Sequence, residues 1–224
     1  MSEFRVNSIT NQDGSAGPQV CGVSTFSGKS GVQIPSGSSD FRRQDGGGRG
    51  IGLFAGGETP RLNVIDKIEI ATTGNATDFG DLIETATNIG GAGNDIRGVF
   101  FAGETPSLVN TIQFVVMSSQ GGSNDFGDMS FDKLGHNGAV ANSTRALSAG
   151  GYSPSSYFNA IEFVTIMTTG DSNDFGDLTV SKYAMGSFSS PTRGLFCGGD
   201  PGNSPNTTDD VDFIEIATTG NALD

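Results

Sequence analysis

The stretch Arg193-Gly-Leu-Phe-Cys-Gly-Gly199 decides the fold, because the chain repeats it. Four arginines each lead into a short apolar segment, and the fourth residues of these segments follow at steps of 47, 47 and 48. The segments are Gly52-Leu-Phe-Ala-Gly-Gly57, Val99-Phe-Phe-Ala-Gly-Glu104, Ala146-Leu-Ser-Ala-Gly-Gly151 and Gly194-Leu-Phe-Cys-Gly-Gly199. Their fourth residues are Ala55, Ala102, Ala149 and Cys197. The arginines that precede them are Arg49, Arg97, Arg145 and Arg193. Self-similarity at a fixed period is the signature of a repeat architecture.

Two further segments recur in every period. A β-branched and aromatic run, such as Ile161-Glu-Phe-Val-Thr-Ile-Met167, follows each glycine-ended segment and predicts a strand. A segment rich in Gly, Asn and Asp comes next, as in Thr168-Thr-Gly-Asp-Ser-Asn-Asp-Phe-Gly-Asp-Leu178. Because these residues accept unusual backbone angles and cap their own turns, we expect a turn with a short strand there.

One period therefore holds four short strands, which is typical of a propeller blade. Solenoids of helix pairs have similar periods, but these apolar runs are short, β-branched and glycine-bounded, without the spacing of a helix. The predicted fold class is all-β, a small β-propeller of about four four-stranded blades behind an extended N-terminal segment. Ala55-Gly-Gly57 and its copies are expected in the innermost strands, where small residues let backbones approach closely.

The two ends of the chain differ from the repeats. Residues 1–30 are polar and rich in turn residues, and we expect them to be an arm that becomes ordered on a partner. Residues 31–224 are the predicted propeller, in which residues 31–49 complete the last blade. The alternative is that the sequence is a fragment and that more blades follow.

Composition excludes several classes of function. The net charge is −13 with 12 Lys and Arg, so the basic stripe that nucleic acid requires is missing. Cys21 and Cys197 are far apart in the sequence, which indicates neither a disulfide framework nor a zinc site, and Cys197 is expected to be a small buried residue. No apolar run has membrane length and no signal core is present, so we expect no membrane insertion and no export by a cleaved signal.

The sequence indicates no catalytic centre and no cofactor. The single histidine, His136, has no partners in sequence for nucleophilic or metal chemistry. The acidic segments offer candidate ligands for a loose calcium site, with side-chain-capped turns as the alternative interpretation. These candidates are Asp78, Asp81, Asp125, Asp128, Asp174 and Asp177. We expect the repeated arginines to pair with such acids and to staple neighbouring blades.

Loops that follow the predicted innermost strands vary in sequence, and variable loops on a rigid scaffold are where recognition is expected. The last of them, Asp200-Pro-Gly-Asn-Ser-Pro-Asn-Thr-Thr-Asp209, is the longest. The candidate binding residues in these loops are Glu58, Glu104, Tyr152, Tyr157, Asp200 and Asn203.

Two resemblances follow from these segments. The glycine pairs at a period near 47 resemble kelch-like propellers, although kelch blades usually carry a Trp and this chain has none. The stretches Ile65-Asp-Lys-Ile-Glu-Ile-Ala-Thr-Thr-Gly-Asn-Ala-Thr-Asp-Phe-Gly-Asp-Leu82 and Ser190-Pro-Thr-Arg-Gly-Leu-Phe196 resemble repeats of structural proteins of marine tailed phages, cyanophages in particular. The opening, with Val23-Ser-Thr-Phe-Ser-Gly28 and Gln33-Ile-Pro-Ser-Gly37, is similar to N-terminal segments of phage tail and fibre proteins.

The resemblance implies a non-enzymatic structural protein of the virion, present in many copies. Its N-terminal segment would dock on other virion proteins, and its propeller would project as a tail, fibre or appendage component that binds a glycan or protein of the host surface. One alternative is a propeller enzyme that acts on host surface polysaccharide, which would need two carboxylates flanking a cleft. Another is a cellular kelch-type interaction module.

Overall fold

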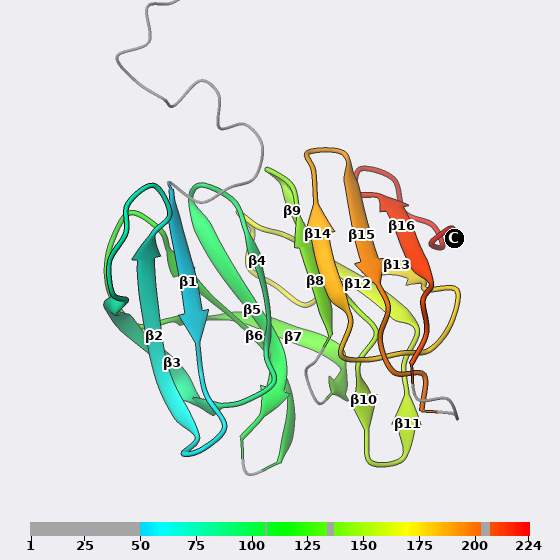
Figure 1. Cartoon of the computed structure of the whole chain (residues 1–224), viewed down its shortest axis with the longest axis horizontal. Coiled ribbons are helices and arrows are strands. Elements are labelled where there is room, and N and C mark those ends of the chain that lie inside the picture. Colours follow the sequence, from blue (N-terminus) through cyan, green and yellow to red (C-terminus); the bar gives the residue numbers. More distant parts are fainter. Residues whose placement is uncertain (1–49, 106, 134–136, 203–206) are drawn as a thin grey trace, which may run out of the picture. The chain divides into compact units, whose positions relative to one another are not determined.

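The computed structural model describes residues 50–105, 107–133, 137–202 and 207–224, all within one compact unit, Ser39–Asp224. The described residues form strands and turns without helices, arranged as small antiparallel sheets (Figure 1). The predicted all-β class is therefore confirmed. The predicted docking arm, residues 1–30, and the predicted closing strand, residues 31–49, lie outside the described residues.

Each repeat contributes one sheet, and the third repeat adds a short hairpin. The first sheet has the order β1 (Ile51–Ala55), β2 (Leu62–Glu69), β3 (Thr77–Ala86), and the second β4 (Gly90–Gly93), β5 (Arg97–Glu104), β6 (Leu108–Val116), β7 (Asn124–Lys133). The third has the order β8 (Gly138–Ala141), β9 (Arg145–Ala149), β12 (Ala160–Thr165), β13 (Asn173–Asp177), and the last β14 (Gly186–Ser189), β15 (Arg193–Cys197), β16 (Val211–Glu215). The hairpin pairs β10 (Tyr152–Ser153) with β11 (Ser156–Tyr157).

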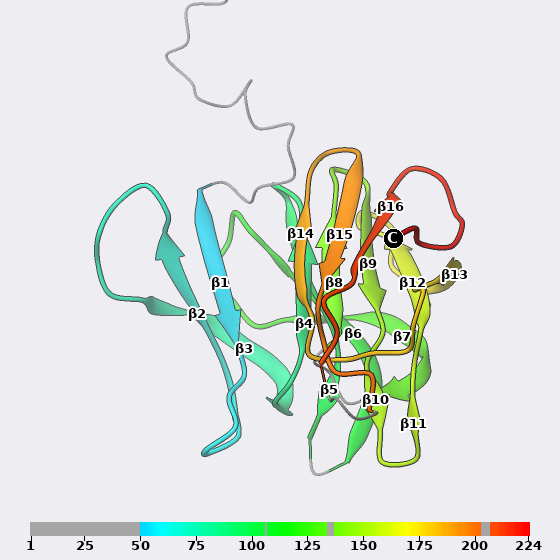
Figure 2. The ribbon, with the colours of Figure 1, turned by 45° about the vertical axis from the view of Figure 1, so that its right-hand side comes forward.

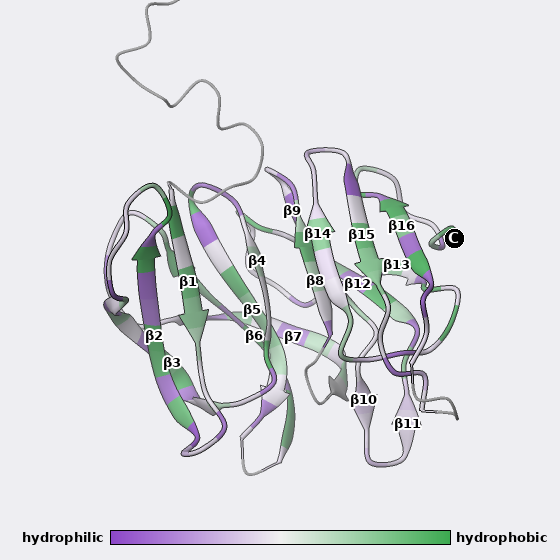
Figure 3. Cartoon of the chain, viewed as in Figure 1, coloured by the Kyte–Doolittle hydropathy of each residue, from purple (hydrophilic) through white to green (hydrophobic). Residues whose placement is uncertain are grey.

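The central strands are covered on both faces, as their apolar composition predicts. In β6, Ile112 and Phe114 pack with residues of the third repeat, whereas Val115 packs with residues of the first repeat. Figure 3 shows apolar residues distributed along the strands of all four sheets. The hydrophobic core is thus divided into three clusters, one between each pair of consecutive repeats.

The segment rich in Gly, Asn and Asp forms a turn followed by an outer strand, as predicted: Thr168 N donates to Thr165 O (2.9 Å) in the turn, and Asn173–Asp177 form β13. Gly127 in β7 has a φ of 146°, and a Cβ atom on it would overlap the carbonyl group of Gly170 in the next repeat. The backbones meet so closely because Gly170 N donates to Phe126 O (2.7 Å) and Ser172 N donates to Asp128 O (2.9 Å). The strand provides the exposed carbonyl groups that the next repeat needs.

This backbone contact recurs at the other two junctions. Its remaining hydrogen bonds run from Gly121 N to Phe79 O, from Ser123 N to Asp81 O, from Gly220 N to Phe175 O and from Ala222 N to Asp177 O. The repeats are therefore joined by main-chain hydrogen bonds at their outer edge as well as by side-chain packing.

The innermost position was assigned to the wrong strands. Consecutive sheets contact one another mainly through β4, β8 and β14, whereas β5, β9 and β15 are the second strands of their sheets. Ser187 illustrates the contact, since its hydroxyl group donates to the carbonyl oxygen of Ala139 in β8 (2.9 Å). The short, glycine-rich β4 was not singled out because it carries few apolar residues.

The sequence alignment of the second repeat is one residue out of register. Strand pairing aligns Ala55 with Phe101, because Ala55 lies opposite Ile65 and Phe101 opposite Ile112. Ala102 then occupies the position of Gly56 and has a φ of 53°, against 77° for Gly56. Alanine tolerates this left-handed conformation at a cost, and the alanine–glycine pair in the sequence conceals the shift.

The repeated arginines do staple neighbouring repeats, but not through acidic side chains. Arg97 Nη1 donates to Ile166 O (2.9 Å) and Arg145 Nη1 donates to Ile216 O (3.0 Å), in each case in the next repeat. Each guanidinium group also lies over a phenylalanine ring of its own repeat. Arg193 instead pairs with Glu215 (2.7 Å) at an exposed site, and Arg49 lies outside the described residues.

A buried polar side chain on each later central strand reaches back to the preceding repeat. Gln113 Oε1 accepts from Ile83 N (3.0 Å), and Glu162 Oε1 accepts from Ser130 N (2.9 Å). Asp212 occupies the same position and accepts from Thr179 Oγ1 (2.5 Å). It also forms a fully buried ion pair with Lys182 (3.1 Å). Each interface therefore contains a buried polar side chain beside its apolar cluster.

The arginine staples predict a difference in stability between two matched variants. Arg97→Ala removes a hydrogen bond between repeats and a contact with the Phe114 ring, and we expect the free energy of unfolding to fall by about 2 kcal/mol. Arg193→Ala removes an exposed ion pair and a contact with the Phe213 ring of its own repeat (5.3 Å), but no bond to another repeat, and should cost under about 1 kcal/mol. Urea unfolding of dilute protein measures both values, and equal losses would contradict the staple.

Candidate functional site

The candidate binding loops emerge together at one end of the unit. Figure 1 shows the β1–β2, β5–β6 and β15–β16 loops and the β10–β11 hairpin at its lower end. Figure 2 shows the hairpin at the same end after a turn of the view. The loops share this end because β1, β5, β9 and β15 are equivalent strands that run in the same direction. The predicted binding residues divide into two groups within these loops.

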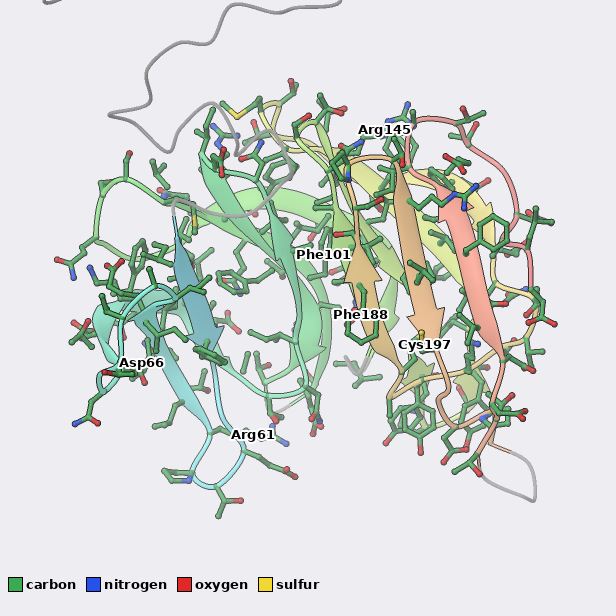
Figure 4. The ribbon with its side chains drawn as sticks, turned by 45° about the horizontal axis from the view of Figure 1, so that its top comes forward. Arg61, Asp66, Phe101, Arg145, Phe188 and Cys197 are labelled. Atoms are coloured by element: carbon green, nitrogen blue, oxygen red, sulfur yellow. The ribbon has the colours of Figure 1, made fainter. Side chains whose placement is uncertain are left out.

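The first group is an ion pair between two repeats. Arg61, labelled in Figure 4, contacts Glu104 of the second repeat with Nη2 and Oε1 2.5 Å apart. Both side chains are about one third exposed. Glu58 forms a backbone bridge with Arg61, and its side chain is exposed. This arrangement links the first loop to the second repeat and leaves little of Glu104 for a ligand.

The second group is a cluster of tyrosines. Tyr152 and Tyr157 lie opposite each other in the hairpin, with ring centroids 6.0 Å apart. Tyr183, from the segment before β14, lies 4.7 Å from the ring of Tyr152 and 5.8 Å from that of Tyr157. Phe158 follows the hairpin and packs on Phe131 of β7 at 5.5 Å, which holds the hairpin against the second repeat.

Asp200 anchors the cluster from the last repeat. Its Oδ2 accepts a hydrogen bond from the Tyr183 hydroxyl group (2.9 Å), and its Oδ1 accepts one from Gly202 N (2.7 Å). Asp200 and Tyr183 also exchange two backbone hydrogen bonds. The backbone of Gly202 lies against the ring of Tyr157, where a Cβ atom would overlap the ring. The cluster is therefore fixed by two repeats rather than by one mobile loop.

The carboxylate raises the pKa of the Tyr183 hydroxyl group. The main cause is the hydrogen bond that Tyr183 donates to Asp200, which only the neutral phenol can make. Burial, the negative charge of Asp200, and the neighbouring Tyr157 and Tyr152 act in the same direction. Tyr183 is therefore a hydrogen-bonded neutral phenol at neutral pH rather than a base.

Sequence reasoning found Tyr152, Tyr157 and Asp200 but missed Tyr183. A positional signal was present, since Thr87 occupies the same place two repeats earlier and exchanges the same backbone hydrogen bonds with Glu104. Asn203 and His136 lie outside the described residues. Cys197 is half-buried rather than buried, and it is a free thiol.

The six candidate calcium ligands are not brought together. They lie on β3, β7 and β13 of three different sheets, where the carbonyl groups of Asp81, Asp128 and Asp177 accept hydrogen bonds from the next repeat. In the part of the chain that the structure describes, no three His, Cys, Asp or Glu side chains are close enough to hold a metal ion.

A hollow lies between the first two repeats, away from the tyrosines. It has a volume of about 190 Å³ and is lined by Leu53, by glycines of β4 and by residues around Arg97. Apart from Asn94 and Arg97, this lining is glycine and apolar. Because both of these side chains already make hydrogen bonds, the hollow has no free convergent polar groups.

Comparison with known proteins identifies no relative. No protein-family model matches the sequence, and no curated protein matches it. Over the residues that the structure describes, no helix is long and apolar enough to span a membrane. The site must therefore be interpreted from its own chemistry, which is three tyrosine faces beside one carboxylate.

The raised pKa of Tyr183 can be measured directly, because the chain has three tyrosines and all lie in the cluster. We expect one phenol to titrate above the ordinary value of about 10. The stability that its hydrogen bond provides is present below that value and is lost as the pH rises through the folded-state pKa. Absorbance of tyrosinate against pH reports the titration.

Asp200→Asn should lower the pKa of this phenol, because the hydrogen bond then goes to a neutral acceptor. Asp209→Asn is the matched control, since it removes the same charge from an exposed position of the same loop. The assignment would be wrong if both variants shifted the titration equally.

Proposed function

We propose that this chain is a non-enzymatic structural protein of a tailed-phage particle. Residues 1–30 dock on other virion proteins, and the repeats project as a tail, fibre or appendage component. Support comes from the regular joining of the repeats by backbone and side-chain contacts, which suits a load-bearing scaffold presented in many copies. The resemblance of the repeats and of the opening segment to phage structural proteins supports this location.

The proposed architecture of the projecting part is a kelch-like β-propeller with the four sheets as blades. Two observations support it: neighbouring sheets pack face to face, and their first strands, β4, β8 and β14, contact one another. Within the described residues the sheets form no closed ring. A complete propeller thus requires the free faces of the first and last sheets to be covered.

The projecting end binds a saccharide of the host surface, and the tyrosine cluster is the observation that carries this proposal. Sugar rings stack their C–H faces on aromatic rings, and their hydroxyl groups donate to carboxylates. Tyr157 is 43% exposed and lies beside Tyr152. Asp200 holds Tyr183 in place, and Asp200 itself remains half-exposed. Tyrosine combines an apolar face with a polar edge, which suits such a ligand.

The virion location predicts that the protein is found in purified particles. We expect mass spectrometry of particles from the producing phage to detect it, and cryo-electron microscopy to show residues 1–30 against a tail or capsid protein with the repeats outside. Its absence from particles, together with its presence in infected cytoplasm, would overturn the virion role and favour a cellular interaction module.

The saccharide site predicts a selective loss of binding. Tyr157→Ala and Tyr152→Ala should each weaken binding to polysaccharide from cyanobacterial cell envelopes by about tenfold, because each removes one stacking face. Glu58→Gln, in the neighbouring loop group, should bind as the unmodified protein does. Isothermal titration measures affinity, and an assay of released reducing ends separates binding from cleavage. Release of reducing ends by the unmodified protein would replace the binding role with an enzymatic one.

A further inference from the structure

No other described residues cover one apolar face of the first sheet and one of the last. Each inner sheet packs one face on the preceding repeat and the other on the following repeat. Ile70 of the first repeat is 67% exposed, whereas Ile166 and Ile216, at the same repeat position, are fully buried against the preceding repeat. The exposure of Ile70 thus arises from its place in the first repeat and not from its place within the repeat.

Aromatic side chains mark both free faces. Phe54 is 60% exposed, while Phe196 at the same repeat position is fully buried. Phe188 of the last sheet is 64% exposed, while Val140 at its position is 2% exposed. Figure 4 shows Phe188 on β14. We name the free face of the first sheet the leading face (Phe54, Ile68, Ile70) and that of the last sheet the trailing face (Phe188, Leu195, Phe213).

The interface between the third and fourth repeats shows how such faces fit. The ring of Phe196 lies so close to Gly138 that a Cβ atom there would meet it at 2.6 Å, and the side chain of Val140 lies equally close to Gly194 at 2.7 Å. Each face therefore inserts a side chain over a glycine of the other.

The two free faces carry the same reciprocal pattern. Strand pairing places Phe54 at the repeat position of Phe196, and Gly186 at the repeat position of Gly138. Because Phe196 lies over Gly138, Phe54 of the leading face is the counterpart of Gly186 on the trailing face. In the same way, Phe188 has the repeat position of Val140, and Gly52 has that of Gly194. Because Val140 lies over Gly194, Phe188 of the trailing face is the counterpart of Gly52 on the leading face. Beyond Gly186 there is room, since the nearest atoms to a Cβ there belong to Phe188 and Cys197 and are at least 3.8 Å away. The leading and trailing faces are thus the two halves of one interface.

The arginine contact of this interface is also in place. Arg97 and Arg145 donate to the carbonyl oxygens of Ile166 and Ile216 in the following repeat. Arg193 occupies their position on the trailing face with 59% of its side chain exposed. The carbonyl group of Ile70 is the equivalent acceptor on the leading face.

We propose that two copies of this chain associate head to tail, the trailing face of one against the leading face of the other. A second copy is the occupant because the two faces carry the reciprocal pattern of a repeat interface, and because within the described residues of one chain both faces stay exposed. Two copies that exchange both contacts form a closed ring and leave no free apolar face. Their combined sheets fall within the range of about four to eight blades of known propellers. This inference does not depend on saccharide binding.

Sedimentation velocity of the 224-residue chain tests the proposal. We expect the unmodified protein to be a dimer, and Ile70→Glu and Phe188→Glu each to raise the dissociation constant by at least about tenfold. Mixing these two variants should restore a dimer, because one carries an intact trailing face and the other an intact leading face. A monomer at all concentrations, or a mixture that stays monomeric, overturns the proposal.

Ile96→Glu is the matched control, because Ile96 is 46% exposed in the β4–β5 turn and away from both faces. The Ile96→Glu variant should associate as the unmodified protein does. If it stayed monomeric, a general loss of apolar surface, and not the proposed contact, would explain the weaker association of the other two variants. Circular dichroism checks folding. If a glutamate variant unfolds, a serine variant takes its place: Phe54→Ser for Ile70→Glu, and Phe188→Ser for Phe188→Glu. Serine is tolerated at the repeat position of Phe54, because the third repeat carries Ser148 there.

Discussion

The structure depends on one contact: the glycine of each Asn-Asp-Phe-Gly-Asp strand lets the next repeat lie directly on its backbone. At Gly127 any side chain would collide with the backbone of Gly170, so the two main chains approach to hydrogen-bonding distance only because residue 127 is glycine. This contact fixes the distance and register between repeats at the outer edge of the sheets. The apolar clusters between the sheets can then be small, because the backbone already sets how the faces meet.

The buried polar residue of each central strand adds specificity that apolar packing lacks. Two apolar faces can slide past each other at modest cost, but Gln113, Glu162 and Asp212 each have one set of donors in the preceding repeat. A slip by one residue would leave a buried acceptor without a partner, at a cost of roughly 1–3 kcal/mol. The pair formed by Lys182 and Asp212 makes the last interface the most sensitive, since a buried charge without its partner is costly.

Sequence reasoning predicted the all-β class, the four repeats and the strands rich in β-branched residues, because these features are periodic in composition. It misplaced the innermost strands, since β4 consists of glycine and alanine and carries no apolar signal. It predicted the turn and the strand that contains Asp-Phe-Gly-Asp, but not the contact of the strand's glycine with the next repeat, because that contact depends on residues more than 40 positions away. Three of the four cluster residues were predicted from loop variety, while Tyr183 lies outside those loops and becomes their neighbour only through backbone pairing.

The tyrosine cluster shows how a repeat scaffold acquires a site without losing its fold. Thr87 and Glu104 exchange backbone hydrogen bonds at the junction of the first two repeats, and Tyr183 and Asp200 exchange the same bonds at the last junction. The scaffold therefore fixes these two positions whatever side chains they carry. Substitution to tyrosine and aspartate adds a hydroxyl–carboxylate bond, and the hairpin adds two more rings. Because the backbone geometry precedes the side chains, recognition can change at one junction while the others keep only a structural role.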